Sequence, residues 1–425
     1  DLPGASIIWA IQQDHENPDL LFVAAEYGIY FTINGGTNWH KAGGAPTIAF
    51  RDLKLQRRDN DLVGATFGRG VYILDDYSAL RSMAADGFGN GATLFPVRDA
   101  WWYIPSAPSQ AVGMPTLGSD SFTTPNPEFG ATFTYYLDKD LENSKLERKS
   151  REDSLREDGK NIPFPGWERL GEEALETEPR VLILVSDSQD NPVRWIEASA
   201  KKGTHRFSWD LRFPAPDAID LSTPEFVPPW AGSSKGPLAS PGSYSAQLYA
   251  LSGDRVQPLD EAQRFTVKPV QAASGGINYA EVAAYQQASS VLIRKVIDAN
   301  EELGRTQELL KHMKAAAINA PGAAPSLFTR LDAFGAELGR LETRLTGDRV
   351  RGRLSETSIP SIYGRAYNAA NNWDTTRPAT ATQKADFEIA TNEFAIFEDN
   401  LEALLTGQLA QLEADLKAAG APSWR

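Results

Sequence analysis

One stretch of sequence is written twice near the start of the chain, and it constrains the fold more than any other feature. Residues 20–30 (LLFVAAEYGIY) align without a gap on residues 62–72 (LVGATFGRGVY), so that Gly28 and Gly70 are equivalent and the offset is 42 residues. A repeat of roughly 40–45 residues built from short strands has the length of one four-stranded β-propeller blade. The repeat therefore predicts two consecutive propeller blades over residues 1–82.

The strands of each copy are expected where apolar runs are bounded by turn residues. They are expected at 7–11, 21–25 and 29–33 in the first copy and at 50–55, 62–66 and 70–74 in the second. Two blades cannot close a ring, and their sheets would leave strand edges exposed, which natural proteins avoid. We therefore expect the remaining blades to come from sequence upstream of Asp1 or from a separate chain. The first residue is not Met, so Asp1 is interpreted as the start of a fragment or of a mature piece.

A turn motif lies in the first copy, at residues 32–39 (TINGGTNW). It resembles the Asp-box, Ser/Thr-x-Asp-x-Gly-x-Thr-Trp, of the BNR-repeat propellers of sialidases, some glycoside hydrolases and sortilin-type receptors. Thr32, Gly36 and Trp39 match, whereas Asn34 stands in the place of the Asp and Asn38 in the place of the second Thr. In such a motif the acid caps turn amides, the glycine takes a positive φ and the Trp packs between blades. Asn34 suits a capping role and not a catalytic one.

A second resemblance covers residues 60–76. The phrases 60–63 (NDLV) and 67–76 (FGRGVYILDD) are similar to the final blade of a large bacterial family. Its members are usually called BNR-repeat or sortilin-N-terminal-like "glycosyl hydrolase" proteins, a name taken from the propeller and not from an activity. The resemblance implies an exported protein, which would be periplasmic, outer-membrane-associated or secreted, and it implies a small immunoglobulin-like domain after the propeller.

Residues 83–270 are expected to form that domain, an immunoglobulin-like or fibronectin-III-like β-sandwich. Strands with period-2 alternation are expected at 131–136, 181–185, 193–196, 205–211, 243–249 and 264–267, with turn residues between them. The phrases 205–212 (HRFSWDLR) and 241–244 (PGSY) resemble the same family. A charged insert at 138–160, with eight acids and seven bases, interrupts the pattern. It is interpreted as a solvated helix or mobile loop, or as a docking arm for a partner.

Residues 271–425 carry the periodicity of packed helices. Apolar stripes whose spacing alternates between four and three run from Tyr285 to Ala317 and from Leu327 to Leu345, and a third runs from Phe387 to Leu416. The segment 321–325, which begins and ends with proline, separates the first two stripes. Short connections imply antiparallel neighbours, so the fold class is multidomain β plus α with a C-terminal antiparallel helical bundle.

Composition narrows the chemistry of the chain. With 42 basic against 56 acidic residues its net charge is -14, which disfavours nucleic acid as a partner. Cysteine is absent and the four histidines are scattered, so we expect neither a metal site nor a cofactor. No apolar run is long enough to predict a transmembrane segment.

Two functions of different classes remain. The first is an exported binding or assembly module for glycan or protein ligands. The second is part of a glycoside hydrolase whose two carboxylates lie mainly in upstream blades, so that this stretch alone is inactive. The candidate catalytic carboxylates are Glu26, Asp52, Asp75 and Asp76, although turn capping or surface charge is the more common role of such residues. Candidates for stacking on sugars are Trp101, Trp102 and Trp230, although packing in a core or linker is the more common role of such residues.

Overall fold

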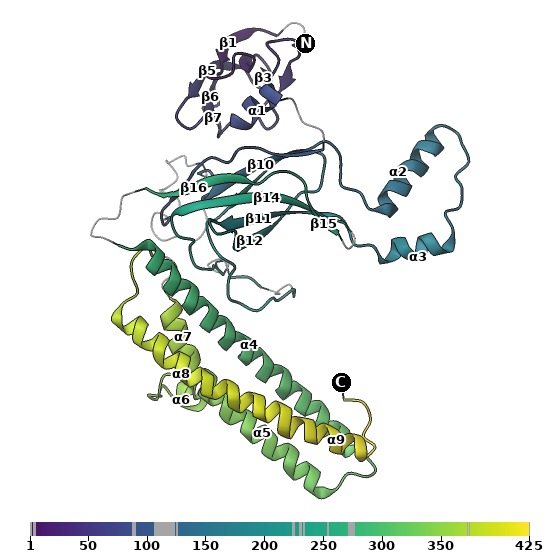
Figure 1. The fold of residues 1–425 in the computed structure, drawn as a ribbon, viewed down its shortest axis with the longest axis vertical. Helices are drawn as coiled ribbons and strands as arrows, with labels where there is room; N and C mark the ends of the chain where they lie inside the picture. The colour runs from purple at the N-terminus through teal and green to yellow at the C-terminus, as the bar shows by residue number, and fades with distance from the viewer. Residues whose placement is uncertain are drawn as a thin grey trace. The chain divides into compact units, whose positions relative to one another are not determined.

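The computed structural model describes residues 2, 6–86, 91–105, 124, 126–222, 226–228, 232, 234–252, 255–270, 277–371, 373 and 375–424, without the side chains of residues 85 and 86. The chain is a mixture of β and α structure, with several sheets followed by a C-terminal helical region (Figure 1). It divides into two compact units. The first contains Asp1–Trp101, Thr123–Asp210 and Gly242–Lys268, and the second contains Trp102–Phe122, Leu211–Pro241 and Pro269–Arg425.

The duplicated sequence forms two antiparallel meanders. The first has four strands in sequence order, β1 (Ile8–Gln13), β2 (Leu21–Ala25), β3 (Gly28–Thr32) and β4 (His40–Lys41). The second has three, β5 (Phe50–Gln56), β6 (Asp61–Thr66) and β7 (Val71–Leu74), and helix α1 (Ser78–Asp86) follows. All six strands expected from the repeat are present. Where the 42-residue offset would place the counterpart of β4, the chain forms α1 instead.

The two meanders are alike in detail but differ by one residue in register. Each first strand carries an irregularity at an equivalent place, after Ile8 in β1 and after Phe50 in β5. Ala24 pairs with Ile29 in the first copy, whereas Ala65 pairs with Val71 in the second. One strand of the second hairpin is therefore displaced by one residue, relative to its neighbour, from what the ungapped alignment predicts. A longer connection, closed by the amide of residue 66 on the carbonyl of residue 70, absorbs the difference.

One apolar core holds the two meanders together. Its buried members are Leu20, Phe22, Ala24, Ile29, Phe50, Leu53, Leu62 and Tyr77. They come from both sheets and from the residue before α1, so the sheets pack face to face with α1 closing one end. Each fully buried side chain of this size stabilises the fold by about 1.5–3 kcal/mol.

Two further sheets in the first unit share an aromatic core. One has the order β13 (Gly203–Trp209), β10 (Ala131–Leu137), β8 (Ala92–Leu94). The other has the order β12 (Pro192–Ala198), β11 (Arg180–Asp187), β14 (Gly242–Ser252), β16 (Gln263–Pro269), β9 (Ala100–Trp102), with β15 (Arg255–Pro258) beside β14. Phe265 of β16 lies 5.7 Å from Phe133 and 6.3 Å from Trp209, measured between ring centroids. The predicted strands are confirmed, and β10 buries every second residue as the alternation requires.

The charged insert forms a helical hairpin between β10 and β11. Helix α2 (Ser144–Glu157) buries none of its residues, and α3 (Trp167–Leu175) follows it (Figure 1). Asn143 caps α2 by accepting a hydrogen bond from the Leu146 amide at 3.0 Å.

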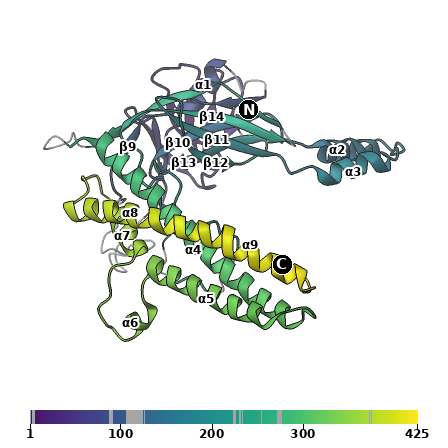
Figure 2. The ribbon, with the colours of Figure 1, turned by 60° about the horizontal axis from the view of Figure 1, so that its bottom comes forward.

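The C-terminal helices share one core. They are α4 (Tyr279–Ile318), α5 (Pro325–Thr346), α6 (Arg349–Arg353), α7 (Ile362–Ala370), α8 (Ala381–Ala403), the π-helical segment η2 (Leu404–Leu409) and α9 (Ala410–Ala418). Figure 2 shows α4, α5 and the α8–α9 rod lying alongside one another. The stripe predicted on α5 is confirmed, because Leu327, Leu331, Phe334, Leu338, Leu341 and Leu345 are all buried. Among the helices of the described residues, none is both long and apolar enough to cross a membrane.

The segment η2 marks a place where the helical stripe was predicted only in part. Leu405 and Leu409, which belong to the predicted stripe, pack against the core as half-buried residues, whereas Leu404, which the stripe omits, is the buried residue of η2. The sequence spaces Phe397, Leu401, Leu405 and Leu409 four apart, a run that drifts around an α-helix of 3.6 residues per turn. The wider π turn absorbs that drift and returns Leu412 to the core.

Candidate functional site

Strand β7 is an edge strand without a partner on its outer side among the described strands. It is the last strand of its sheet, and all four of its side chains, Val71, Tyr72, Ile73 and Leu74, are exposed. Thr66 donates its amide hydrogen to the Gly70 carbonyl at 3.0 Å, which makes these two residues a hydrogen-bonded pair. Such pairs alternate along an antiparallel ladder, so the amides of Val71 and Ile73 point away from β6. The edge offers free donors and acceptors to an added strand.

The outer face of strands β6 and β7 is apolar. Val63 and Ala65 of β6 lie beside Ile73 and Val71 of β7, on the face opposite the core. Gly64, between the two β6 residues, faces the core, since a Cβ there would lie 2.8 Å from the Phe50 ring. Val71 and Ile73 are each more than half exposed. We call this combination of the β7 edge and the 63/65/71/73 face the open edge.

Glu26, a predicted carboxylate candidate, belongs to a cluster of two exposed aromatic and two half-buried charged side chains. Its Oε2 accepts a hydrogen bond from Trp9 Nε1 at 3.0 Å. The guanidinium of Arg51 lies 3.6 Å from the centroid of the Trp9 ring and 5.0 Å from that of Phe67. Phe67 is 72% exposed. We call Trp9, Glu26, Arg51 and Phe67 the Trp9–Arg51 cluster. Sequence reasoning missed Trp9 and Arg51, although they occupy equivalent positions, 42 residues apart, in the two copies of the repeat.

The structure does not gather the other carboxylate candidates around Glu26. Asp52 is exposed on the outer face of β5, 3.7 Å from Lys54 Nζ. Asp75 follows β7 at the opposite end of the hairpin from Phe67, because Leu62 pairs with Leu74 there. Burial, and after it the nearby Asp61 carboxylate, raises the pKa of Asp75.

Asp76 caps the start of α1. Its Oδ1 accepts hydrogen bonds from the Ser78 amide at 3.2 Å and from the Ser78 hydroxyl at 2.6 Å. Both interactions are local, and they fix the turn that ends the β7 segment.

The segment that resembles an Asp-box forms a closed turn. Thr32 is buried and donates its hydroxyl to Asn34 Oδ1 at 2.9 Å, while its oxygen accepts the Gly36 amide at 3.0 Å. Asn34 Oδ1 also accepts the Asn38 amide at 2.9 Å, and Gly36 has a φ of 93°. Trp39 packs on a small cluster at the second face of the first sheet. These contacts hold the hairpin.

The three tryptophans proposed as sugar platforms differ in position. Trp101 is exposed on β9. Trp102 is buried, donates Nε1 to the Ala239 carbonyl at 2.8 Å and packs edge-to-face on Tyr279 at 4.9 Å. It also lines a pocket of about 740 Å³ together with Tyr103 and residues 376–378. Trp230 lies outside the described residues.

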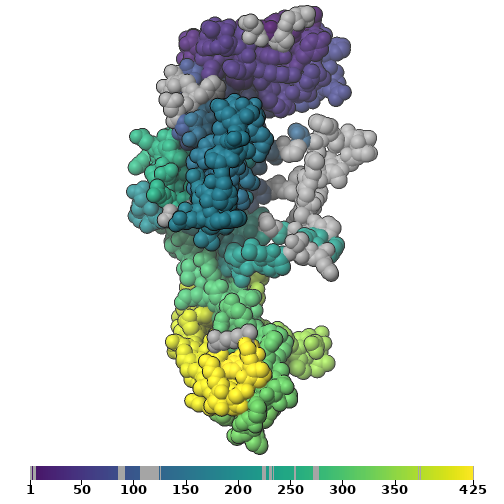
Figure 3. Space-filling view, turned by 90° about the vertical axis from the view of Figure 1, so that its right-hand side faces the viewer, coloured from purple at the N-terminus to yellow at the C-terminus, as the bar shows by residue number. Residues whose placement is uncertain are grey.

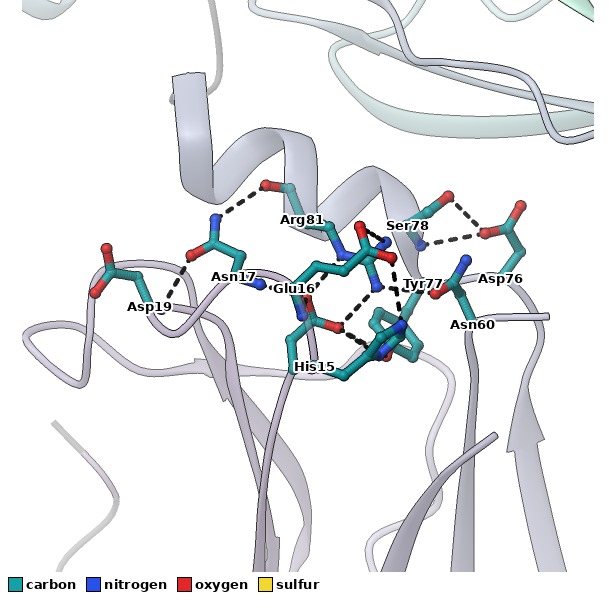
Figure 4. A network of polar contacts seen from close by, with 10 residues as sticks. His15, Glu16, Asn17, Asp19, Asn60, Asp76, Tyr77, Ser78 and Arg81 are labelled. Atoms are coloured by element: carbon teal, nitrogen blue, oxygen red, sulfur yellow. Dashed lines mark hydrogen bonds and ion pairs between the residues drawn. The ribbon is translucent and has the colours of Figure 1, made fainter. Parts of the chain in front are cut away.

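A buried polar network, which sequence reasoning missed, anchors the turn before β2 to α1. The Asp14 carboxylate accepts Arg81 Nε at 2.7 Å, Arg81 Nη2 at 2.8 Å and the Tyr77 hydroxyl at 2.8 Å. Arg81 also donates to Asn60 Oδ1 at 2.8 Å, so the turns of both meanders meet at one guanidinium (Figure 4). No local pattern signals this network, because Asp14 and Arg81 are 67 residues apart. Within the described residues, no group of three or more His, Cys, Asp or Glu is arranged to hold a metal ion.

Comparison with known proteins adds little to this geometry. No protein-family model and no curated protein matches the chain. Among solved structures it is similar to the extracellular domain of BT4673 from B. thetaiotaomicron, at 10% identity and a TM-score of 0.14, over 62% of this chain and 25% of that one. It is also similar to PorZ, a surface component of the type-IX secretion system of Porphyromonas gingivalis, at 11% identity and a TM-score of 0.17, over 61% of this chain and 30% of that one.

Both of these neighbours are extracellular or surface proteins. The chain spans between a quarter and a third of their length. At such TM-scores the likeness carries no argument about the fold or the activity of this chain.

Proposed function

We propose that residues 6–86 are the terminal blades of a larger β-propeller in an exported binding or assembly protein, and that the open edge is where further β-structure joins. The observation that carries this proposal is β7, an edge strand with no partner on its outer side among the described strands, whose four side chains are all exposed. Natural sheets shield such edges with charge, proline or a covering segment. Strand β7 contains neither a charged residue nor proline, and no strand of the described residues pairs with its outer side. A strand of the same protein, or of another chain, would cover it.

Strand addition would use the chemistry that the open edge presents. The added strand would form main-chain hydrogen bonds with the outward amides of Val71 and Ile73 and with the neighbouring carbonyls. Pockets that accept every second side chain of the added strand would determine which sequences bind. The 63/65/71/73 face would then pack on the next sheet, as the inner faces of the two meanders already pack on each other. The helix α1, which stands in place of a fourth strand, explains why this edge is left to be completed from elsewhere.

Residue-resolved hydrogen–deuterium exchange tests the open edge directly. In the 425-residue chain we expect the amides of Val71 and Ile73 to exchange fast and those of Tyr72 and Leu74, which face β6, to exchange slowly. In the natural protein with its remaining blades, all four should exchange slowly. Equal protection of all four in this chain alone, or fast exchange of Val71 and Ile73 in the complete protein, would contradict the proposal.

The substitution Ile73→Pro separates folding from assembly. It removes only an outward amide, so the 425-residue chain should fold with its stability lowered by no more than about 1 kcal/mol, whereas strand addition is blocked. The matched variant Val63→Pro lies in the central strand β6, where every amide is paired, and should cost about 3 kcal/mol or more. If Ile73→Pro leaves the protection of the Val71 amide in the complete protein intact, β7 is not the joining edge.

The Trp9–Arg51 cluster is the surface that we propose for ligand contact. Exposed aromatic rings stack on sugar rings or fill protein pockets, and the adjacent carboxylate and guanidinium supply directional hydrogen bonds. A glycan-array screen of the complete protein, with reducing-sugar detection, distinguishes the ligand classes. Binding that is lost in Phe67→Ala but kept in Trp101→Ala supports a glycan site at the cluster. Release of reducing sugar would instead favour the hydrolase.

A further inference from the structure

Helix α3 buries a charged side chain and exposes its large apolar side chains, the opposite of a usual amphipathic helix. Its carboxylate Glu173 is buried, whereas Trp167 is 81% and Leu175 is 86% exposed. Trp167, Gly171 and Leu175 follow one another at intervals of four residues, so they lie along one face of the helix, opposite Glu173. The space-filling view in Figure 3 shows the α2–α3 hairpin turned toward the viewer.

Ion pairs hold this orientation in place. Arg148 of α2 donates Nε to both oxygens of Glu173, at 2.9 Å each, and Nη1 to Glu152 at 2.7 Å. Arg148 Nη2 also lies 2.8 Å from Glu173 Oε2, and Arg169 adds a further contact to Glu173 at 3.3 Å. The hydrogen bond from Arg148, with its charge, lowers the pKa of Glu173. Because bidentate guanidinium–carboxylate pairs fix geometry, the apolar side of α3 is locked outward.

The outward side has the composition of an interface centre. Phe164, 62% exposed, packs edge-to-face on Trp167 with ring centroids 5.1 Å apart. A Cβ on Gly171 would meet nothing within 4 Å, which leaves a notch between Trp167 and Leu175 that a partner side chain can fill. Tryptophan and phenylalanine with little surface buried in the monomer are typical anchors of protein interfaces.

The hairpin also carries two exposed pairs of like charges, one pair on each helix. Glu168 and Glu172 border the apolar stripe of α3 four residues apart, and Lys145 and Lys149 lie four residues apart on α2. None of these four exposed side chains has an ion-pair partner within the described part of the chain. Each pair repels itself on its own helix. The equal spacing lets the two acids of one copy meet the two bases of another.

From these observations we propose that the α2–α3 hairpin binds a second copy of this chain about a two-fold axis. Such an interface is self-complementary: α2 of each copy lies against α3 of the other, so the Lys145/Lys149 pair meets the Glu168/Glu172 pair twice. Trp167 and Phe164 of both copies fill the centre, with Leu175 beside them. The inference is independent of the open edge and of the ligand proposal.

Sedimentation velocity of the full chain is the primary test, at concentrations on the order of 1 to 100 µM, where a modest interface equilibrates. We expect a monomer–dimer equilibrium that weakens as salt is raised, because exposed ion pairs are screened. Trp167→Ala should weaken association about thirtyfold, the equivalent of one anchor residue. The matched control, Trp101→Ala, removes an exposed tryptophan from β9 and should leave the equilibrium unchanged.

Charge reversal gives the sharper test. The variant Lys145→Glu/Lys149→Glu should be monomeric, and so should Glu168→Lys/Glu172→Lys, because each opposes like charges at both contacts. An equimolar mixture of the two variants should form a heterodimer, since both of its contacts again pair acid with base. Circular dichroism and melting curves close to those of the wild type check that the reversals leave the fold intact, because all four side chains are exposed.

The outcomes decide the proposal. A wild-type chain that stays monomeric over the whole range overturns it, and so does a dimer that Trp167→Ala does not weaken. Failure of the two charge-reversal variants to associate with each other overturns the two-fold arrangement. Binding of monomeric wild type to phosphatidylcholine vesicles, lost in Trp167→Ala, would overturn the second copy in favour of a lipid surface.

Discussion

At the scale of single residues, Asp14 is a buried carboxylate held in a polar network. Its side chain has no exposed surface, and it accepts hydrogen bonds from Arg81, from the Tyr77 hydroxyl and from the Asn17 amide at 2.9 Å. Burial by itself would raise the pKa of Asp14, but these hydrogen bonds outweigh it and hold the pKa well below the ordinary aspartate value. Burial, followed by the hydrogen bond to Asp14, raises the pKa of Tyr77.

The lowered pKa of Asp14 predicts a pH dependence of stability. Since the folded-state pKa lies below the unfolded value near 3.8, the contribution is complete above that value and is lost as pH falls below it. We expect Asp14→Ala to lower the free energy of unfolding at pH 7 by about 3–5 kcal/mol, because it leaves Arg81 without its partner. Asp14→Asn should lose less stability than the wild type does between pH 5 and pH 3, measured by urea unfolding.

The exposed Asp52 provides the matched control for Asp14. It lies in the same pair of meanders, and its partner Lys54 is 3.7 Å away at the surface. Asp52→Ala should therefore change the free energy of unfolding by less than about 1 kcal/mol. A loss for Asp14→Ala no larger than that for Asp52→Ala would show that the network does not stabilise the fold.

Two glycines of one sheet separate backbone strain from steric clash. Gly130, just before β10, has a φ of 123°, and a Cβ there would lie 1.8 Å from the Trp209 carbonyl oxygen. Gly203, at the start of β13, has a φ of 118° and open space around it. We expect Gly203→Ala to cost about 1–2 kcal/mol, the penalty of the conformation alone. Gly130→Ala should cost several kcal/mol, which thermal melting detects; equal losses would contradict the clash.

At the scale of elements, the π-helical segment η2 brings the apolar residues of α9 back to the face that packs on the core. The buried residues before and after it, Leu401, Leu404, Leu412 and Leu416, carry one residue more than a strict alternation of three and four allows. A π turn is the usual consequence of one additional residue in an α-helix. The additional residue in the stripe therefore accounts for the π turn at η2.

Deleting Gly407 should remove the π turn. The core residues would then follow a spacing of three and seven, which an uninterrupted α-helix satisfies, so we expect unchanged or higher helicity and stability by circular dichroism and urea unfolding. Gly339 lies within the regular stripe of α5, and its deletion is the matched control. This deletion should turn Leu341 and Leu345 away from the core and lower the free energy of unfolding by more than about 3 kcal/mol. Equal losses from the two deletions would contradict this account of η2.

At the scale of the whole molecule, each of the two compact units has a core of its own. Phe133 is fully buried between the sheets of the first unit, and Phe334 is fully buried among the helices of the second. Truncation of a buried phenylalanine to alanine costs about 3–5 kcal/mol.

Calorimetry of the two core variants tests whether the units unfold separately. We expect two transitions, with Phe133→Ala lowering the midpoint of one and Phe334→Ala lowering the midpoint of the other. The wild type under the same conditions fixes the reference midpoints. A single transition that both variants shift alike would show instead that the chain unfolds as one cooperative body.

The sequence by itself determined the features that repeat along the chain. The six strands of the duplicated meander, the alternating burial of β10 and the α5 stripe from Leu327 to Leu345 are periodic patterns, and a period is a local property of the chain. One pair of residues in the candidate site could also be read from the repeat, because Trp9 and Arg51 occupy equivalent positions in its two copies. Their stacking was not predicted. The assignments of blades, sandwich and ligand class stay predictions.

Only the tertiary structure decided which distant groups meet and which surfaces stay uncovered. Asp14 binds Arg81, which is 67 residues away in the sequence. Helix α1 follows β7 at the point in the sequence where the repeat would place a fourth strand. On α3, Glu173 rather than Trp167 is buried. The physical reason is that the local sequence favours a helix or a strand but does not determine which other element that helix or strand packs against. The burial of a side chain depends on the rest of the chain that folds over it.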